Sequence, residues 1–307
     1  MILSVSRRTD IPALYVDWFF DQLKQGFVLV PNPMNTKKIQ KIQLQPVKIE
    51  RNLLGGVEVS GNVDGIVFWS KNPQPLLARI EELKDFKFYF QYTLNAYDQR
   101  FEAGIPPLEK RIKTFQDLSK HCPVVWRYDP IFLGSGITIE WHKEQFENIA
   151  KQLAGYTDRC MIKCLRDKFA GIVTPTTSQI IEIATALSAI GKKHGIEVQT
   201  CAEIMNLESY GIKQGKCTDP EIFEKLLGNI SLKTKKLDGQ RKNCRCIPCV
   251  DIGVYDTCSH GCTYCYARHS IFAKATCSAN ANKIKEMYDG FDGEIYDRKT
   301  ERIFDYK

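Results

Sequence analysis

The sequence predicts an α/β protein whose body is a (β/α) barrel, or a partial barrel, of about six or seven strands. Residues 1–204 repeat one theme, in which an apolar segment is followed by a polar loop and an amphipathic segment. Several of the apolar segments are apolar on both faces, which is typical of parallel strands covered by helices. A last apolar segment, Val250–Tyr255, leads directly into a cysteine-rich loop.

Six segments in the first part of the chain are predicted as strands because they are short and rich in Val, Ile, Phe and Tyr. In chain order they are Ile2–Ser6, Gly65–Trp69, Phe86–Leu94, Val124–Tyr128, Cys160–Leu165 and Ile196–Ala202. Together with Val250–Tyr255 they would form the wall of the barrel.

Helices are predicted between and after these strands from their start and stop signals. Asp10-Ile11-Pro12 begins a helix that ends near Gly26. The other predicted helices are Leu76–Leu83, Gln179–Lys193, a helix from Thr218 to about Leu227, and Ser270–Met287. Thr218 is the expected N-cap of its helix, with Glu221 positioned to complete a capping box.

The size and composition of the chain fit one large domain or two modest ones. We expect a barrel body over residues 1–210, a cysteine-containing connector over 211–250, and a final part, 251–307, packed into the same barrel. Charged residues interrupt the N-terminus, and no apolar run is long enough to span a bilayer, so a cytoplasmic protein without membrane contact is expected. The net charge of +7 permits an anionic partner.

The twelve cysteines argue for metal binding or redox chemistry, because disulfides are rare in cytosolic proteins. Cys258, Cys262 and Cys265 have the spacing C-x3-C-x2-C. A cube of four irons normally takes four thiolates, so three thiolates leave one iron open to another ligand. An open position distinguishes a reactive metal site from a closed structural one. The alternative is that these cysteines form half of a zinc site.

The aromatic residue Tyr264 before the last cysteine completes a pattern that resembles the cluster loop of the radical S-adenosylmethionine enzymes. The resemblance implies a [4Fe-4S] cluster whose open iron binds S-adenosylmethionine. It also implies an electron donor such as flavodoxin or ferredoxin. In most members of that superfamily the loop follows the first barrel strand, whereas here about 250 residues precede it. The resemblance therefore implies a circularly permuted barrel, in which the cluster-bearing strand is C-terminal and lies beside the first strand.

Polar side chains gather where the predicted strands end, which is the active face of α/β barrels. These candidates for cofactor and substrate binding are Arg7, Arg8, Lys71, Asn72, Arg127 and Glu203. Buried arginines would be costly without anionic partners, so an anionic group on a small substrate is expected. Cys164 and Cys201 also lie near strand ends, where either could donate a hydrogen atom to a substrate radical. The alternative for both cysteines is a place in the core.

Several motifs make nearly the whole chain resemble the DUF1848 family, which is described by a C-terminal cysteine cluster like that of radical S-adenosylmethionine proteins. The motifs are Ser4–Pro12, Val67–Pro73, Arg127-Tyr128-Asp129-Pro130 and Asp251–Cys258 with the cluster loop. Lys71-Asn72-Pro73 and Arg127–Pro130 are also similar to barrel motifs of the spore photoproduct lyase group. The Gly-Gly-Glu element that often binds the methionine amino group in the superfamily is missing after the second predicted strand, and Glu203 is a candidate substitute.

A second group of cysteines, Cys244, Cys246 and Cys249, lies shortly before the cluster loop, and Cys217 could supply a fourth thiolate. Four thiolates without an open position suit a second iron–sulfur cluster or a structural zinc ion. The alternative is a set of reduced free thiols in a surface segment.

A protein of a different class is also consistent with the cysteine-rich C-terminal third. Zinc or an iron–sulfur cluster could stabilise a nucleic-acid-binding protein without radical chemistry. The basic side chains that would contact phosphates are Lys233, Lys235, Lys236, Arg241, Lys242 and Arg245. A 200-residue α/β body would be unnecessary for such a module, so the enzyme is the favoured interpretation.

Overall fold

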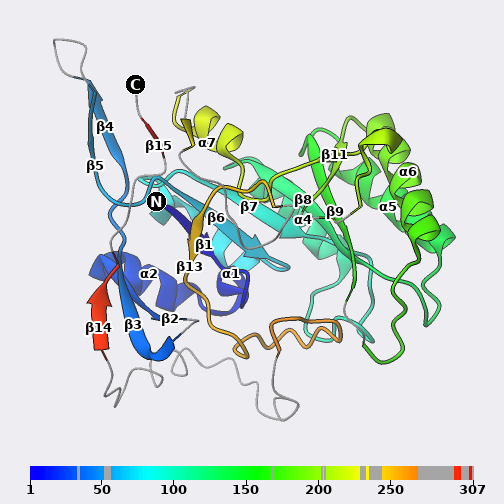
Figure 1. Cartoon of the computed structure of the whole chain (residues 1–307), viewed down its shortest axis with the longest axis horizontal. Coiled ribbons are helices and arrows are strands. Elements are labelled where there is room, and N and C mark those ends of the chain that lie inside the picture. The colour runs from blue at the N-terminus through cyan, green and yellow to red at the C-terminus, as the bar shows by residue number, and fades with distance from the viewer. Residues whose placement is uncertain are drawn as a thin grey trace.

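The protein is organised around one open, parallel, eight-stranded sheet (Figure 1). The computed structural model describes residues 1–32, 35–51, 57–166, 169–201, 203, 205–228, 233–234, 244–268, 294–298 and 304–305. The strands are β1 (Ile2–Val5), β6 (Gly65–Ser70), β7 (Phe88–Thr93), β8 (Val124–Ile131), β9 (Arg159–Cys164), β10 (Glu197–Thr200), β11 (Lys213–Gln214) and β13 (Cys249–Asp251). Their order across the sheet is β11-β10-β9-β8-β7-β6-β1-β13.

The strands predicted from the sequence are confirmed, with boundaries that differ by a few residues. The adjacency expected for the cluster-bearing strand is also confirmed, because β13 pairs in parallel with β1, with Leu3 opposite Val250. β11 was not predicted; its two residues give too short a pattern to recognise.

The closed barrel is not confirmed, because the sheet does not close. Among the described residues, the edge strands β11 and β13 each pair with one neighbour, β10 and β1 respectively. Both edges are two or three residues long and offer few backbone groups for further pairing. The backbone of Cys217 also lies over one face of the sheet, where its carbonyl accepts hydrogen bonds from Tyr89 Oη at 2.6 Å and Gln91 Nε2 at 2.8 Å. This segment covers a face that strands would enclose in a barrel.

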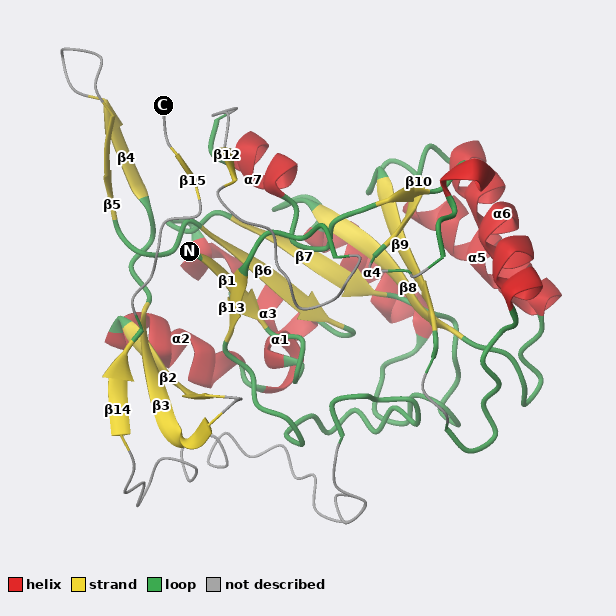
Figure 2. Cartoon of the chain, viewed as in Figure 1, coloured by secondary structure: helices red, strands yellow, loops and turns green. Residues whose placement is uncertain are grey.

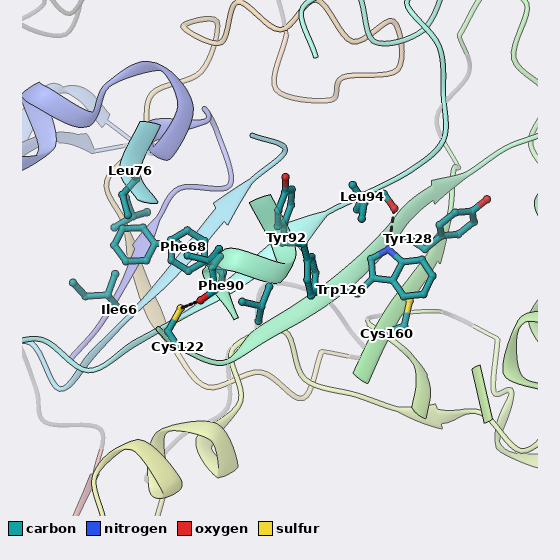
Figure 3. Close-up of a cluster of buried hydrophobic side chains, with 14 of the residues drawn as sticks. Ile66, Phe68, Leu76, Phe90, Tyr92, Leu94, Cys122, Trp126, Tyr128 and Cys160 are labelled. Atoms are coloured by element: carbon teal, nitrogen blue, oxygen red, sulfur yellow. Dashed lines mark hydrogen bonds between the residues drawn. The ribbon is translucent and has the colours of Figure 1, made fainter. Parts of the chain in front are cut away.

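Helices cover the other face of the sheet and bury the main hydrophobic core with it. They are α1 (Ile11–Leu14), α2 (Val16–Gln25), α3 (Gln74–Leu77), α4 (Leu108–Leu118), α5 (Ile139–Leu153) and α6 (Thr177–Lys193). Alternate strand residues such as Phe68, Phe90 and Trp126 point into this core (Figure 3). The Trp126 indole donates a hydrogen bond to the Leu94 carbonyl at 2.9 Å, so its one polar atom is satisfied.

A smaller apolar cluster lies on the opposite face of the sheet, which we call the inner face. Strand residues Val67, Tyr89 and Val125 contribute to it. Helix α7 (Pro220–Leu226) covers them with Phe223, whose ring meets the ring of Tyr89 at 5.2 Å between centroids. Three cysteines, Cys201, Cys217 and Cys246, belong to the same cluster.

Several short strands lie outside the main sheet and were not predicted. β2 (Phe27–Asn32), β3 (Asn35–Gln43) and β14 (Glu294–Asp297) form one small sheet. β4 (Lys48–Arg51) pairs with β5 (Val57–Ser60), and β12 (Lys233–Thr234) pairs with β15 (Phe304–Asp305). Two 3-10 helices, Ile80–Leu83 and Glu208–Tyr210, complete the described elements.

The helix signals are largely confirmed, with three local differences. The predicted helix Leu76–Leu83 is instead α3 (Gln74–Leu77) followed by the separate 3-10 helix Ile80–Leu83. The first predicted helix is divided at Tyr15, and its second part ends at Gly26, which is left-handed with φ +82° as a C-cap glycine often is. Asp219 rather than Thr218 caps α7, because its carboxylate accepts a hydrogen bond from the Glu221 amide at 3.1 Å. The predicted helix Ser270–Met287 lies outside the described residues. Within those residues, no helix combines the length and apolarity that crossing a bilayer requires.

Candidate functional site

The loop that follows β13 runs along the carboxyl ends of the central strands (Figure 2). We call it the cluster loop, after its group of three cysteines, Cys258, Cys262 and Cys265. It pairs with the loop after β7, where Glu102 and Cys262 form an antiparallel bridge. The Gly104 amide donates to the His260 carbonyl at 2.8 Å, and a Cβ at Gly104 would come within 2.9 Å of that oxygen. Glycine is therefore required where the two loops approach.

A pocket forms on this loop, and all three cysteines of the C-x3-C-x2-C motif line it. Its walls are Asp256, Cys258, His260, Gly261, Cys262, Cys265, Ala267 and Arg268. Among the described residues, the three sulfurs do not form a group within the 4.8 Å mutual spacing that a single ion would require.

Buried charged side chains contact the cluster loop at Tyr264. Lys71 Nζ lies 2.7 Å from Glu102 Oε1 and donates to the Tyr264 hydroxyl at 3.1 Å. Tyr264 also donates to Glu102, and Arg111 Nη1 lies 3.7 Å from the second oxygen of Glu102. Burial acts to raise the pKa of Glu102, but the positive charges of Lys71 and Arg111 outweigh it and lower the pKa. Glu102 is therefore held as a carboxylate between two cations.

Two further contacts tie the cluster loop to the N-terminal part of the chain. Asp10 accepts a hydrogen bond from the Lys71 amide at 2.8 Å, and the same oxygen lies 2.8 Å from His260 Nε2. The Tyr15 hydroxyl donates to the Thr257 carbonyl at 2.5 Å. Asp10 also caps α1 by accepting from the Ala13 amide, so one carboxylate orients a helix, a strand end and the cluster loop.

Asp251 joins β13 to the end of β1. Its carboxylate accepts hydrogen bonds from Ser4 Oγ at 2.8 Å, Ser6 Oγ at 2.5 Å and the Arg7 amide at 2.8 Å. Gly253 follows so closely that a Cβ there would lie 1.8 Å from Ser6 Oγ. The chain therefore needs glycine at 253 to enter the loop beside β1.

The arginines predicted at strand ends have partners within the protein. Arg7 contacts Asp251 and donates to Cys249 Sγ at 3.2 Å, while Arg127 pairs with Asp129. Both guanidinium groups also lie over the ring of Trp69, at 5.7 and 5.1 Å from its centroid. The sequence therefore predicted the positions of these charges but not Trp69, which brings Arg7 and Arg127 onto one surface of the inner face.

Four other candidate residues make contacts different from those of Arg7 and Arg127: Arg8, Asn72, Glu203 and Cys164. Arg8 donates to the Gly253 carbonyl at 3.3 Å, and the Asn72 amide donates to Ser70 Oγ. Buried Glu203 pairs with Arg166. Cys164 packs in the helix-covered core, where burial raises the pKa of its thiol to about 12. The structure therefore does not bring Cys164 to the cluster pocket.

A second group of thiols lies on the inner face. The sulfurs of Cys201, Cys217 and Cys246 all lie within 4.8 Å of one another and are buried, so this group could hold a metal ion. Two of its members, Cys217 and Cys246, belong to the set that the sequence suggested. The third is Cys201 from the end of β10, which the sequence suggested as a hydrogen-atom donor. Cys249 is not in the group.

Sequence reasoning missed Glu102 as a support of the cluster loop. It is a single acidic residue in a loop, 162 positions from Tyr264, and no spacing connects the two. The basic side chains of the alternative nucleic-acid interface lie mostly outside the described residues, and Arg245 is exposed.

The fold and the site together define an α/β protein with an open parallel sheet, a cysteine-lined pocket at its carboxyl edge and a second thiol group on its inner face. The chain belongs to the family described as "Domain of unknown function (DUF1848)", whose family model matches residues 2–267. A search of curated proteins gave no match.

Proposed function

We propose that this protein is a radical S-adenosylmethionine enzyme. In this proposal Cys258, Cys262 and Cys265 bind three irons of a [4Fe-4S] cluster, and S-adenosylmethionine binds the fourth. The observation that carries the proposal is the pocket that these three cysteines line together. When bound, the reduced cluster would supply the electron that cleaves S-adenosylmethionine to a 5′-deoxyadenosyl radical. A flavodoxin or ferredoxin is the proposed electron donor.

The residues around the pocket hold the cluster loop in place for this chemistry. His260 is fixed by Asp10, and Tyr264 is fixed by Glu102 and Lys71. These contacts are made by buried groups, which would orient the loop and exclude water from the side that faces the sheet. Burial raises the pKa of the Cys262 thiol, and the positive charge of Lys71 opposes that shift, in the direction of the thiolate that would bind iron.

The surface formed by Arg7, Trp69 and Arg127 supports an anionic substrate group. The Trp69 indole N–H is buried and makes no hydrogen bond to the described residues. Arg7 and Arg127 already pair with Asp251 and Asp129, so the anion would not be their sole partner. A carboxylate or phosphate there would accept the indole hydrogen bond beside these two guanidinium groups.

The test is anaerobic reconstitution with iron and sulfide, followed by reduction and an assay for 5′-deoxyadenosine. Wild-type protein should release 5′-deoxyadenosine, and S-adenosylmethionine should change the electron paramagnetic resonance signal of the reduced cluster. The Cys258→Ala/Cys262→Ala/Cys265→Ala variant should do neither, whereas Cys122→Ala, in the helix-covered core, should behave like wild type. A fully loaded cluster that neither responds to S-adenosylmethionine nor cleaves it would refute the proposal.

A further inference from the structure

We propose that Cys201, Cys217 and Cys246, with Cys244 as the fourth ligand, bind a single Zn²⁺ ion on the inner face of the sheet. The site is separate from the cluster loop and does not depend on the proposed function. Its ligands come from the end of β10, the segment after β11 and the segment before β13. An ion there would join these three parts of the chain.

The spacing of the sulfurs fits one ion. In a tetrahedral zinc site with Zn–S bonds of about 2.3 Å, ligand sulfurs lie roughly 3.8 Å apart. The three buried sulfurs already lie within 4.8 Å of one another, so small side-chain shifts would complete the geometry. An iron–sulfur cube would hold its ligand sulfurs farther apart, because each binds a different iron.

Hydrogen-bond donors point at these sulfurs, as they do around metal-bound thiolates. The amide of Cys217 donates to Cys246 Sγ at 3.1 Å, and the amide of Thr218 donates to the same sulfur at 3.5 Å. Arg127 Nη1 donates to Cys217 Sγ at 3.0 Å. Four thiolates on Zn²⁺ carry a net charge of −2, so the buried guanidinium of Arg127 offsets part of that charge.

Cys244 is the fourth ligand because it lies next to the Cys246 thiol and is only partly buried. Neither Cys244 nor Cys249 belongs to the group of sulfurs within 4.8 Å of one another. Cys249 is the alternative fourth ligand, and its sulfur accepts a hydrogen bond from Arg7 at 3.2 Å and contacts Thr218 Oγ1 at 4.0 Å. Cys244 and Cys249 therefore form a matched pair, in which substitution of the first should weaken zinc binding and substitution of the second should not.

The metal would stabilise the segments that cover the inner face of the sheet. The segments that carry Cys217 and Cys246 lie on a small apolar cluster that includes Val67, Tyr89 and Val125. A small core gives limited stability, and a ligand that binds only the folded state adds to it in proportion to its concentration. Removing zinc with a chelator should therefore lower the melting temperature, and adding zinc back should restore it.

The experiment uses the full chain carrying Cys258→Ala/Cys262→Ala/Cys265→Ala, which removes the other metal site. Purified anaerobically with added Zn²⁺, this variant should hold about one zinc per chain and no acid-labile sulfide. Replacing zinc by Co²⁺ should give thiolate-to-cobalt charge transfer and the intense visible bands of tetrahedral cobalt. Adding Cys244→Ser should weaken zinc binding about 10-fold or more in a competition with a chelating dye, while Cys249→Ser and Cys122→Ser should leave it unchanged.

Three outcomes would overturn the proposal. The first is a folded variant, judged by circular dichroism, that binds no zinc. The second is iron with acid-labile sulfide in place of zinc. The third is a disulfide among Cys201, Cys217 and Cys246 in the anaerobic protein. Because Cys258, Cys262 and Cys265 are replaced throughout, failure here is distinguishable from failure of the radical chemistry.

Discussion

Glu102 balances the charges beneath the cluster loop. Its side chain is 1% exposed and faces both Lys71 and Arg111. Removing one partner of a buried ion pair leaves an uncompensated charge, which is more costly than loss of a surface pair. The residue has no sequence signal, yet the cluster loop rests on it through Tyr264.

We expect Glu102→Ala to lower the free energy of unfolding by about 3–5 kcal/mol, because two buried cations lose their shared partner. Urea unfolding at neutral pH would measure it. Glu82→Ala, at a half-exposed pair with Arg79, is the control and should cost less than about 1 kcal/mol. Equal effects of the two substitutions would contradict the role given to Glu102.

His142 gives the fold a predictable response to acid. It is fully buried in α5, with Nδ1 2.9 Å from the Tyr128 hydroxyl and Nε2 2.8 Å from the Phe132 carbonyl. Burial lowers the pKa of the imidazole to about 4, and its hydrogen bond to Phe132 opposes that shift only in part. The neutral ring is therefore the form that fits the fold.

Because the pKa is lower in the folded state than in the unfolded state, His142 contributes its full stability above about pH 6.5 and loses it as the pH falls towards 4. Between pH 6.5 and 4, the free energy of unfolding of wild type should fall by on the order of 3 kcal/mol more than that of His142→Gln. Denaturant unfolding at pH 7, 6, 5 and 4 measures the difference. The exposed His121→Gln should follow wild type, and a difference between wild type and His142→Gln that does not change with pH would contradict the expectation.

At the scale of elements, the pairing of β13 with β1 determines where the cluster loop begins. β13 is three residues long and has few ladder hydrogen bonds of its own. Asp251 compensates by accepting hydrogen bonds from two serines and one amide of the β1 end. The contact is between side chains and backbone, so its strength does not depend on strand length.

Asp251→Ala should therefore lower the free energy of unfolding by at least about 3 kcal/mol, because several buried donors lose a charged acceptor. It should also reduce iron retention after reconstitution, since the loop would no longer be held beside β1. Asp21→Ala, on the exposed side of α2, should change neither measurement. Unchanged stability in Asp251→Ala would show that β13 is held by other contacts.

At the scale of the whole molecule, one continuous sheet links distant parts of the chain. The main core includes residues from Met1 to Ile252, and β13 at the sheet edge belongs to the last third of the sequence. Each of the six interior strands pairs with a neighbour on both sides, so removing one would divide the sheet. The proposed division at residues 210 and 250 should therefore not correspond to separate unfolding units.

We expect a single unfolding transition, in which far-ultraviolet circular dichroism and tryptophan fluorescence coincide. Trp126 reports on the helix-covered core, and Trp69 reports on the inner face. A Trp69→Phe variant and a Trp126→Phe variant should give the same midpoint by both probes. Two separated transitions would mean that the inner-face cover unfolds by itself.

The sequence by itself determined the local elements and the chemistry of the cysteines. Strands such as Gly65–Ser70 were predictable because apolar, β-branched and aromatic residues fit a sheet buried on both faces. The helix predicted as Gln179–Lys193 was recognisable from local start and stop signals, and the structure begins it two residues earlier, at Thr177. The spacing of Cys258, Cys262 and Cys265 likewise depends on one short loop.

Only the tertiary structure decided which distant residues meet. The sheet stays open because its edge strands β11 and β13 do not pair with each other, and local pattern carries no information on that. Cys201 lies beside Cys217 and Cys246 because β10 ends where the segments that carry those two cysteines cross the inner face. Glu102 likewise contacts Lys71 and Tyr264 because three separate segments of the chain pack together there. Such contacts are fixed by packing between segments that are far apart in sequence, and residue spacing records only neighbours along the chain.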